Sequence, residues 1–258
     1  MILQVTNLGF HYKDQQDIFH GVSFGIHQGE IITILGPNGA GKSTLLNCLA
    51  NLAKPTSGQI MVCGQPLERM SLSEVAKHIG YVSQTHYPAY AYTTRDFVVM
   101  GRTAHIGFFS KPKKEDYAAA DDALHQLGIA HLADKPYTEI SGGERQQVTI
   151  ARVLVQKPQL VLLDEPTSHL DYGNQLRTMK MIKQLAEQNF AIIMTTHMPD
   201  HAILLGGKVG ILDRDGTMTF GHYKDIMTEK TLSRIYNANL KMVYIEEIKR
   251  STCIAVSV

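Results

Sequence analysis

The sequence lacks an excess of charge of either sign, and it lacks any long hydrophobic run. Lys and Arg number 25 and Asp and Glu 24, which gives a formal net charge of +1 over 258 residues. This balance provides no general attraction to nucleic acid or anionic lipid, so no nucleic-acid partner is expected. Apolar stretches such as 190–194 are interrupted long before the ~20 residues that a membrane helix needs. If the protein serves a membrane process, another chain is expected to span the bilayer.

Cysteine is also scarce. Cys48, Cys63 and Cys253 are far apart and form no CxxC pair, which is typical of a protein in a reducing compartment without a disulfide framework. The residues from Met1 to Val5 alternate like a strand and have neither the basic flank nor the apolar stretch of a signal peptide. We therefore expect the chain to remain in the cytoplasm.

The patterns that are present predict a single α/β fold over 1–258 without internal repeats. Aliphatic runs at 31–35, 160–163 and 191–194 each end in a polar loop, as the central strands of a mostly parallel sheet do. Apolar residues recur at helical spacing over 117–127 and 176–185. The section of about 85–155 reads as an inserted helical subdomain between core segments of about 1–84 and 156–221, followed by a C-terminal tail of about 222–258.

The most informative segment follows the first of these strands. It reads Gly36-Pro37-Asn38-Gly39-Ala40-Gly41-Lys42-Ser43-Thr44 and satisfies GxxxxGK[ST]. Its glycines allow backbone N–H groups to turn toward phosphate oxygens, and the following helix presents its positive end. Lys42 adds a charge for the β- and γ-phosphates, Ser43 a hydroxyl for Mg²⁺ and Thr44 a further phosphate contact. The segment predicts a site for a nucleoside triphosphate, with ATP and Mg²⁺ as the expected ligands.

A pair of carboxylates follows the second strand. Because successive residues of a strand face opposite ways, we expect Asp164 to point toward Mg²⁺ and Glu165 toward the water that attacks the γ-phosphate. His197 follows the third strand and is expected to reach the γ-phosphate at the same edge of the sheet. Taken alone, an Asp-Glu pair could simply begin a loop, and one of twelve histidines could be an ordinary surface residue.

The segment Ile140-Ser141-Gly142-Gly143-Glu144-Arg145-Gln146 and the run from Asp164 to Asp171 resemble the signature sequence and the D-loop of ABC ATPases. The resemblance covers about residues 3–221 and follows the family order of phosphate loop, Gln84, signature, acidic strand and His197. It implies a P-loop NTPase fold with an antiparallel β edge. It also implies a homodimer in which each ATP lies between one phosphate loop and the opposite signature.

The resemblance also assigns roles to single residues. Tyr12 resembles the aromatic residue that stacks on adenine, and Gln84 the residue that senses the γ-phosphate and the metal. Ser141, Gly142, Gly143 and Glu144 occupy the positions of the clamp on the opposite ATP, and Asp171 closes the D-loop, so all five are expected near nucleotide. The usual signature is Leu-Ser-Gly-Gly-Gln. Glu144 therefore introduces a negative charge, which would either weaken the clamp slightly or pair with a nearby cation.

Two stretches, 94–102 and 167–175, resemble the importer ATPases that serve iron-siderophores, haem, cobalamin and molybdate. In such systems the segment after Gln84 docks a permease, so 86–102, with Tyr87, Tyr90 and Tyr92, is the candidate coupling surface. The tyrosines could instead cover the core of their own lobe. The expected assembly is an ATPase homodimer on the cytoplasmic face of the inner membrane, with a permease dimer and an external substrate-binding protein. A soluble ABC ATPase, a regulatory nucleotide-binding module and an exporter subunit are the alternatives.

Overall fold

The computed structural model describes residues 1–13, 16–84, 91–106 and 110–256. Its strands are β1 Leu3–His11, β2 Asp17–Ile26, β3 Ile31–Leu35, β4 Ser57–Val62, β5 Gln65–Pro66, β6 Ile79–Val82, β7 Leu160–Leu163, β8 Ala191–Thr196, β9 Lys208–Leu212, β10 Met218–His222, β11 Leu240–Ile245 and β12 Arg250–Ala255. Its helices are α1 Lys42–Leu49, α2 Leu72–His78, α3 Thr94–Val99, α4 Lys114–Gln126, α5 Gly142–Leu154, α6 Tyr172–Glu187, α7 Pro199–Leu205, α8 Tyr223–Ile226 and α9 Glu229–Tyr236. Among these residues, no helix is both long enough and apolar enough to span a membrane.

The central sheet has the strand order β10-β9-β3-β8-β7-β6, and all neighbours are parallel except β10 and β9. Its inner strands β3, β7 and β8 are almost completely buried, which explains their continuous apolar sequences. Leu35 pairs with Thr196, and Leu163 pairs with both Met194 and Val82. The segments that follow these strands therefore meet at one edge of the sheet, as expected.

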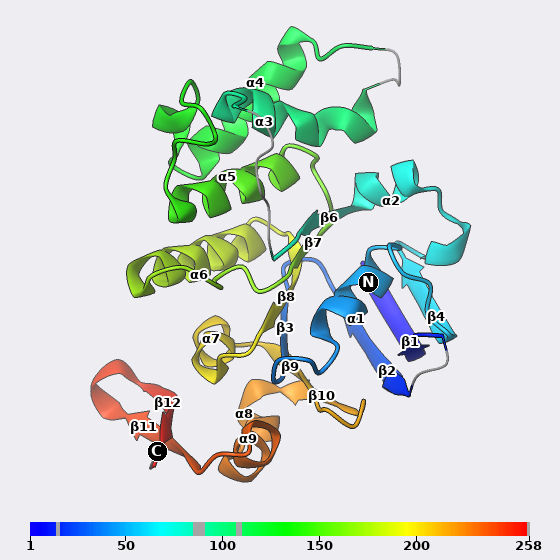
Figure 1. The fold of residues 1–258 in the computed structure, drawn as a ribbon, viewed down its shortest axis with the longest axis vertical. Helices are drawn as coiled ribbons and strands as arrows, with labels where there is room; N and C mark the ends of the chain where they lie inside the picture. The colour runs from blue at the N-terminus through cyan, green and yellow to red at the C-terminus, as the bar shows by residue number, and fades with distance from the viewer. Residues whose placement is uncertain (14–15, 85–90, 107–109, 257–258) are drawn as a thin grey trace.

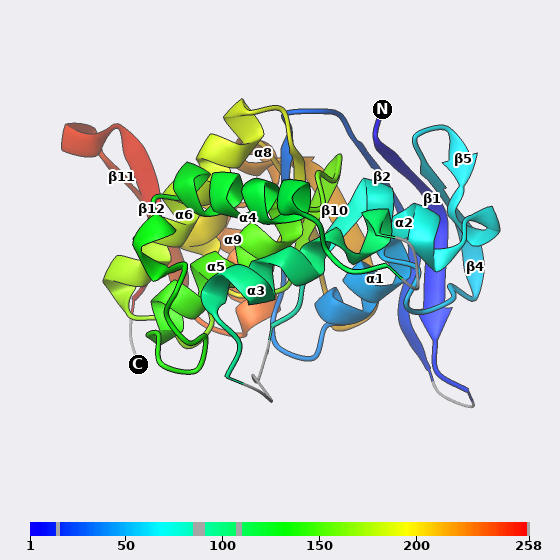
Figure 2. The ribbon, with the colours of Figure 1, turned by 90° about the horizontal axis from the view of Figure 1, so that it is seen from above.

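A second, antiparallel sheet has the order β2-β1-β4-β5. A hydrophobic cluster joins it to α1 and to one face of the central sheet. Viewed from above, this sheet lies at the opposite side of the molecule from the hairpin of β11 and β12 (Figure 2). The predicted α/β fold with a mostly parallel sheet and an antiparallel edge is confirmed.

Helices α3, α4 and α5 form a lobe at one end of the long axis (Figure 1). They bury a cluster of their own that includes Phe97, Leu124 and Val148. The expected helical stripes lie in α4 and α6, and their first members, Tyr117 and Leu176, are 37% and 40% exposed. The tail forms α8, α9 and the β11–β12 hairpin, and it packs against α7 and β9 through a fourth cluster.

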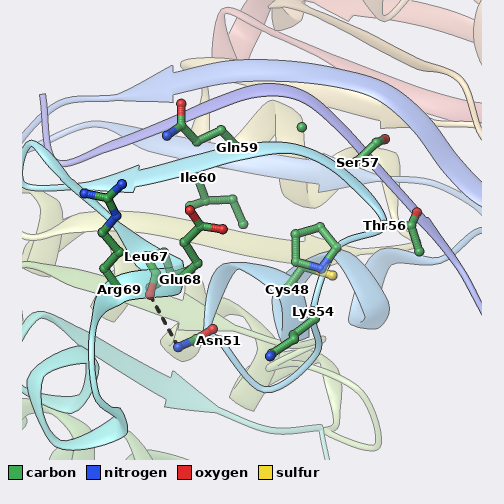
Figure 3. Close-up of a pocket in the computed structure, with 12 residues that line it drawn as sticks. Cys48, Asn51, Lys54, Thr56, Ser57, Gln59, Ile60, Leu67, Glu68 and Arg69 are labelled. Carbon is green, nitrogen blue, oxygen red and sulfur yellow. Dashed lines mark hydrogen bonds between the residues drawn. The ribbon is translucent and has the colours of Figure 1, made fainter.

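A hollow of about 460 Å³ lies between the C-terminal end of α1 and β4 (Figure 3). It is lined by Cys48, Asn51, Lys54, Pro55, Thr56, Ser57, Gly58, Gln59, Ile60, Leu67, Glu68 and Arg69. None of these residues belongs to the predicted nucleotide site. The hollow is therefore separate from the predicted residues at the sheet edge.

Candidate functional site

The phosphate loop runs from the end of β3 to the start of α1, and close packing requires glycine at two of its positions. A Cβ atom on Gly36 would lie 2.4 Å from the carbonyl oxygen of Leu212. Gly41 has φ +96°, in the left-handed region that favours glycine, and its added Cβ would lie 2.4 Å from Ile18. Helix α1 begins directly afterwards at Lys42. Its first N–H groups are therefore presented to the loop, where an anion would be stabilised.

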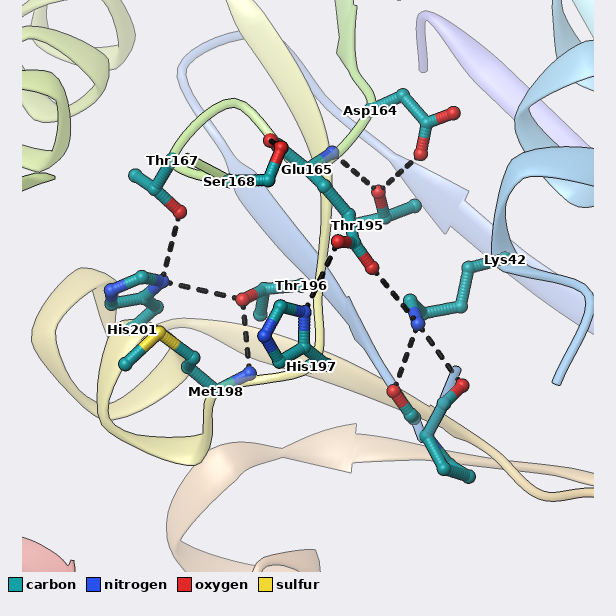
Figure 4. A network of polar contacts seen from close by, with 12 residues as sticks. Lys42, Asp164, Glu165, Thr167, Ser168, Thr195, Thr196, His197, Met198 and His201 are labelled. Atoms are coloured by element: carbon teal, nitrogen blue, oxygen red, sulfur yellow. Dashed lines mark hydrogen bonds and ion pairs between the residues drawn. The ribbon is translucent and has the colours of Figure 1, made fainter. Parts of the chain in front are cut away.

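Lys42 lies inside this turn and is only 5% exposed. Its ammonium group donates to the carbonyl oxygens of Gly36 at 2.9 Å and Pro37 at 3.1 Å. It also forms an ion pair with Oε1 of Glu165 at 3.1 Å (Figure 4). The predicted phosphate-binding cation and the predicted base are thus in direct contact.

Asp164 is the centre of a second set of contacts. Its Oδ1 accepts hydrogen bonds from the hydroxyls of Ser43 at 3.0 Å and Thr195 at 2.7 Å, and its Oδ2 accepts one from Tyr81 at 3.3 Å. Burial raises the pKa of Tyr81, and the Asp164 charge adds to this effect, so the phenol remains a donor. The oxygens of Ser43 and Asp164 are the hard ligands that Mg²⁺ prefers, and they lie side by side at the phosphate loop. These residues fit the predicted metal role.

Glu165 corrects one step of the sequence-based prediction. Asp164 and Glu165 do point in different directions, but β7 ends at Leu163, so strand alternation is not the cause. Glu165 instead has φ +44°, a left-handed conformation that turns the chain and redirects its side chain. Its amide donates to the Thr195 hydroxyl at 2.9 Å, and its carbonyl accepts from both the amide and the hydroxyl of Ser168. These bonds hold a backbone conformation that a non-glycine residue rarely adopts.

The carboxylate of Glu165 lies between the side chains of Lys42 and His197. Oε1 faces Lys42, and Oε2 lies 3.1 Å from Nδ1 of His197 (Figure 4). The Glu165 side chain is 10% exposed, whereas that of His197 is 42% exposed. His197 therefore reaches from the end of β8 to the carboxylate and still faces solvent.

A cavity of about 320 Å³, the predicted phosphate cavity, brings eight of the predicted residues together. It is lined by Ile18, Asn38, Gly39, Gly41, Lys42, Ser43, Thr44, Gln84 and Glu165. Gln84 comes from the segment after β6, which explains how a residue 42 positions from Lys42 in sequence shares its cavity. Tyr12 does not line this cavity. It is 51% exposed, with its ring edge-on to Phe10 at 5.0 Å between centroids.

The signature residues lie at the start of α5. Ser141 caps the helix, with its hydroxyl accepting from the Glu144 amide at 3.3 Å, and the Glu144 carboxylate accepts from the Ser141 amide at 2.8 Å. This reciprocal capping box gives Glu144 a local role that neither sequence-based alternative anticipated. The hydrogen bond with Ser141 lowers the pKa of Glu144 and keeps it ionised.

Gly143 and Asp171 are linked through Asn174. Asp171 caps α6 by accepting from the Asn174 amide at 2.8 Å, and its other oxygen accepts from the Asn174 side chain at 2.7 Å. A Cβ atom on Gly143 would lie 2.5 Å from that side chain. The D-loop and the signature are therefore packed together within one chain. Neither the signature residues nor Asp171 line the phosphate cavity.

A group of threonines and one buried histidine supports the site and was not among the predicted residues. Thr195 bonds to Asp164 and Glu165, while His201 places its Nδ1 3.3 Å from the hydroxyls of both Thr167 and Thr196 (Figure 4). His201 is 4% exposed, and burial lowers its pKa. Thr195, Thr196 and His201 had no sequence signal beyond their position in or just after the apolar run of β8, whereas Thr167 lies in the run that resembles the D-loop.

Of the predicted coupling segment, His86, Tyr87 and Tyr90 lie outside the described residues. Tyr92 and Met100 line a groove of about 730 Å³ on the helical lobe. The other lining residues are Ser73, Asp96, Val99, Thr103, Ile106, Ser110, Pro112 and Tyr117.

Comparison with known proteins gives consistent matches. Residues 19–168 match the family described as ABC transporter. An uncharacterised ABC transporter ATP-binding protein of Haemophilus influenzae is 40% identical over 95% of this chain and 92% of the relative. The molybdate import ATP-binding protein MolC of the same organism is 38% identical over 91% and 88%. An inward-facing structure of a transporter assigned to the metal-chelate type has a TM-score of 0.89 at 34% identity and covers 99% of this chain and 98% of that one.

Proposed function

Because this chain belongs to the ABC transporter family and is one of its ATPases, we propose that it energises import of a metal-chelate type compound through a separate permease. The observation that carries the enzymatic part is the position of Glu165 between Lys42 and His197. A buried carboxylate beside a phosphate-binding lysine is suited to accept a proton from a water at the γ-phosphate. The position of His197 beside it supports contact with the same phosphate.

Phosphate binding and activation of the attacking water are assigned to different residues. The phosphate loop and the first turn of α1 bind the β- and γ-phosphates through backbone N–H groups and Lys42. Glu165 orients the attacking water and accepts its proton, and His197 holds Glu165 on the side opposite Lys42. Since Lys42 is paired with Glu165, a γ-phosphate would compete with the carboxylate for the same ammonium group. This competition would free Glu165 to face the water.

Ser43, Asp164 and Gln84 would hold Mg²⁺, which supplies charge neutralisation to the phosphates when bound. The support comes from the 3.0 Å contact between Ser43 and Asp164 and from Gln84 in the same cavity. Tyr12 is proposed to stack on adenine. Its half-exposed ring is available for such a contact.

The ATPase is proposed to act as a homodimer. The signature residues Ser141 to Glu144 and the D-loop residue Asp171 do not line the phosphate cavity of their own chain. Residues 141 and 142 are exposed at the start of α5, where helix N–H groups would stabilise an anion. Both features are suited to contact with the ATP of a second copy.

The groove on the helical lobe is the proposed permease site. Tyr92, Met100 and Tyr117 line it and are 45%, 40% and 37% exposed, so it offers apolar area to an amphipathic element of a partner. The groove includes residues of the predicted coupling segment 86–102 and reaches beyond that segment to Tyr117. Docking there would place the ATPase peripherally at the cytoplasmic face of the membrane.

The proposed cargo class is a metal in chelated or oxyanion form, including iron-siderophore, haem, cobalamin and molybdate. Iron chelates, cobalamin and molybdate are named in relatives, whereas haem rests on the sequence resemblance alone. The cargo itself would contact the permease and its external binding protein rather than this chain.

Reconstitution tests the importer proposal. The chain and its permease, placed in vesicles with the binding protein, are expected to accumulate the cargo only with ATP. Met100→Asp is expected to weaken permease binding, while Leu52→Asp, at a 61% exposed site outside the groove, serves as the matched control. Equal loss in both variants, or none in either, would contradict the docking site. ATP-driven efflux would contradict import.

A further inference from the structure

The C-terminal tail contacts the segment that carries His197. Tyr236, the last residue of α9, donates from its hydroxyl to the backbone carbonyl oxygen of His197 at 2.8 Å. Burial raises the pKa of Tyr236, so the phenol keeps its proton at neutral pH and remains a donor. A residue 39 positions away therefore fixes the peptide that follows the His197 side chain.

The helix that carries Tyr236 is anchored in the hydrophobic core. Leu232 and Ile235 of α9 are 0% and 3% exposed and belong to the cluster shared with α7 and β9. Asn237, the C-cap residue that follows the helix, has a left-handed φ of +49° and turns the chain toward β11. Tyr236 is itself partly buried and packs against this cluster.

The tail makes a second contact with this segment at Asp200, three residues after His197. Asp200 in the first turn of α7 accepts from the Thr252 hydroxyl at 2.9 Å and from the Cys253 amide at 3.0 Å. Strand β12 runs beside α7 (Figure 1). The tail therefore holds this segment at His197 and again at Asp200.

The segment makes two further contacts beside the peptide that Tyr236 bonds. The Met198 amide donates to the Thr196 hydroxyl at 3.1 Å, which fixes the turn between β8 and α7. On the other side, Nδ1 of His197 contacts Oε2 of Glu165 at 3.1 Å. The side chain of His197 is held by Glu165 and its main chain by Tyr236, so the two contacts act on opposite ends of one residue.

We propose that Tyr236 is a positioning residue for ATP hydrolysis and that its hydroxyl holds the peptide of His197 so that the imidazole stays against Glu165. The inference rests on the proposed roles of His197 and Glu165. It assigns the tail a direct part in the ATPase site, beyond completing the core around α7.

Tyr236→Phe tests this inference because it removes the hydroxyl and keeps the ring. The loss of one hydrogen bond is expected to lower kcat about two- to ten-fold. KM for ATP is expected to stay unchanged, because the phosphate loop and Lys42 are untouched. Tyr244→Phe is the matched control, since Tyr244 lies in the same tail and is 54% exposed. We expect wild-type kinetics from it.

A spectroscopic measurement separates positioning from a general loosening of the tail. The imidazole resonance of His197, assigned by its disappearance in His197→Gln, is expected to shift in Tyr236→Phe and not in Tyr244→Phe. Wild-type kcat in Tyr236→Phe would overturn the inference, and so would a fall in kcat with an unshifted resonance. If Tyr236→Phe does not fold, Thr252→Val replaces it, because this change loosens the same segment at Asp200. A wild-type kcat and an unshifted His197 resonance in Thr252→Val would then overturn the inference.

Failure of the inference can be told from failure of the proposed function. If His197→Gln and Glu165→Gln abolish turnover while Tyr236→Phe has no effect, the ATPase roles stand and only the positioning role is lost. If Glu165→Gln keeps wild-type turnover, the proposed mechanism is wrong whatever Tyr236→Phe does.

Discussion

Gly143→Ala is expected to destabilise the protein because the new methyl group has no room. It would lie 2.5 Å from the Asn174 side chain, and that side chain is held by the Asp171 carboxylate at 2.7 Å. Overpacking of this kind costs about 1–3 kcal/mol of unfolding free energy. Gly142→Ala is the matched control, because a Cβ atom there meets nothing within 4 Å. Its unfolding free energy is expected to stay within about 0.5 kcal/mol of the wild type.

Urea unfolding measures both variants, and a lower midpoint with an unchanged slope reports a change in stability. When Asn174 is already alanine, adding Gly143→Ala is expected to cost much less unfolding free energy than it costs in the wild type. The reason is that the two side chains compete for one space. Equal midpoints for Gly142→Ala and Gly143→Ala would refute the reasoning. A purely additive double variant would refute the link to Asn174.

Two further predictions concern buried titratable groups. Burial raises the pKa of Cys48 to about 12, so a maleimide is expected to label the exposed Cys63 in the native chain and Cys48 only after unfolding; equal native labelling would contradict this. Burial lowers the pKa of His201 below its ordinary value of about 6.5. Below that pH the His201 side chain binds a proton more readily in the unfolded chain than in the native chain, so the unfolding free energy falls as pH falls. His201→Gln is expected to show a weaker loss of unfolding free energy between pH 7.5 and 5 than the wild type, and identical losses would argue against this role of His201.

The cluster at the edge of the central sheet could be predicted because the residues of its loop are contiguous and carry a specific pattern. The loop from Gly36 to Thr44 and the Asp164-Glu165 pair each follow an apolar run, and the edge of a parallel sheet brings the ends of such runs together. The same reasoning led to His197 at the end of β8. Its contact with Glu165 confirms that these strand ends meet.

The supporting contacts could not be predicted, because common residue types far apart in sequence make them. Thr195 bonds to Asp164 only because β8 lies next to β7, and the sequence does not state that order. The left-handed turn at Glu165 has no glycine to signal it. Likewise, Tyr236 lies in a tail whose spacing predicts elements but gives no sign of a bond to His197.

Glu165→Gln tests the central claim most directly. It keeps the shape of the side chain and removes the proton acceptor, so ATP turnover is expected to fall about 10²- to 10⁴-fold. ATP binding is expected to persist, and the ATP-bound dimer is expected to accumulate with Mg²⁺ when measured by light scattering. Glu187→Gln, at an exposed position of α6, is the control and should behave as the wild type. Turnover in Glu165→Gln equal to that of the control would contradict the assignment of Glu165 as the base.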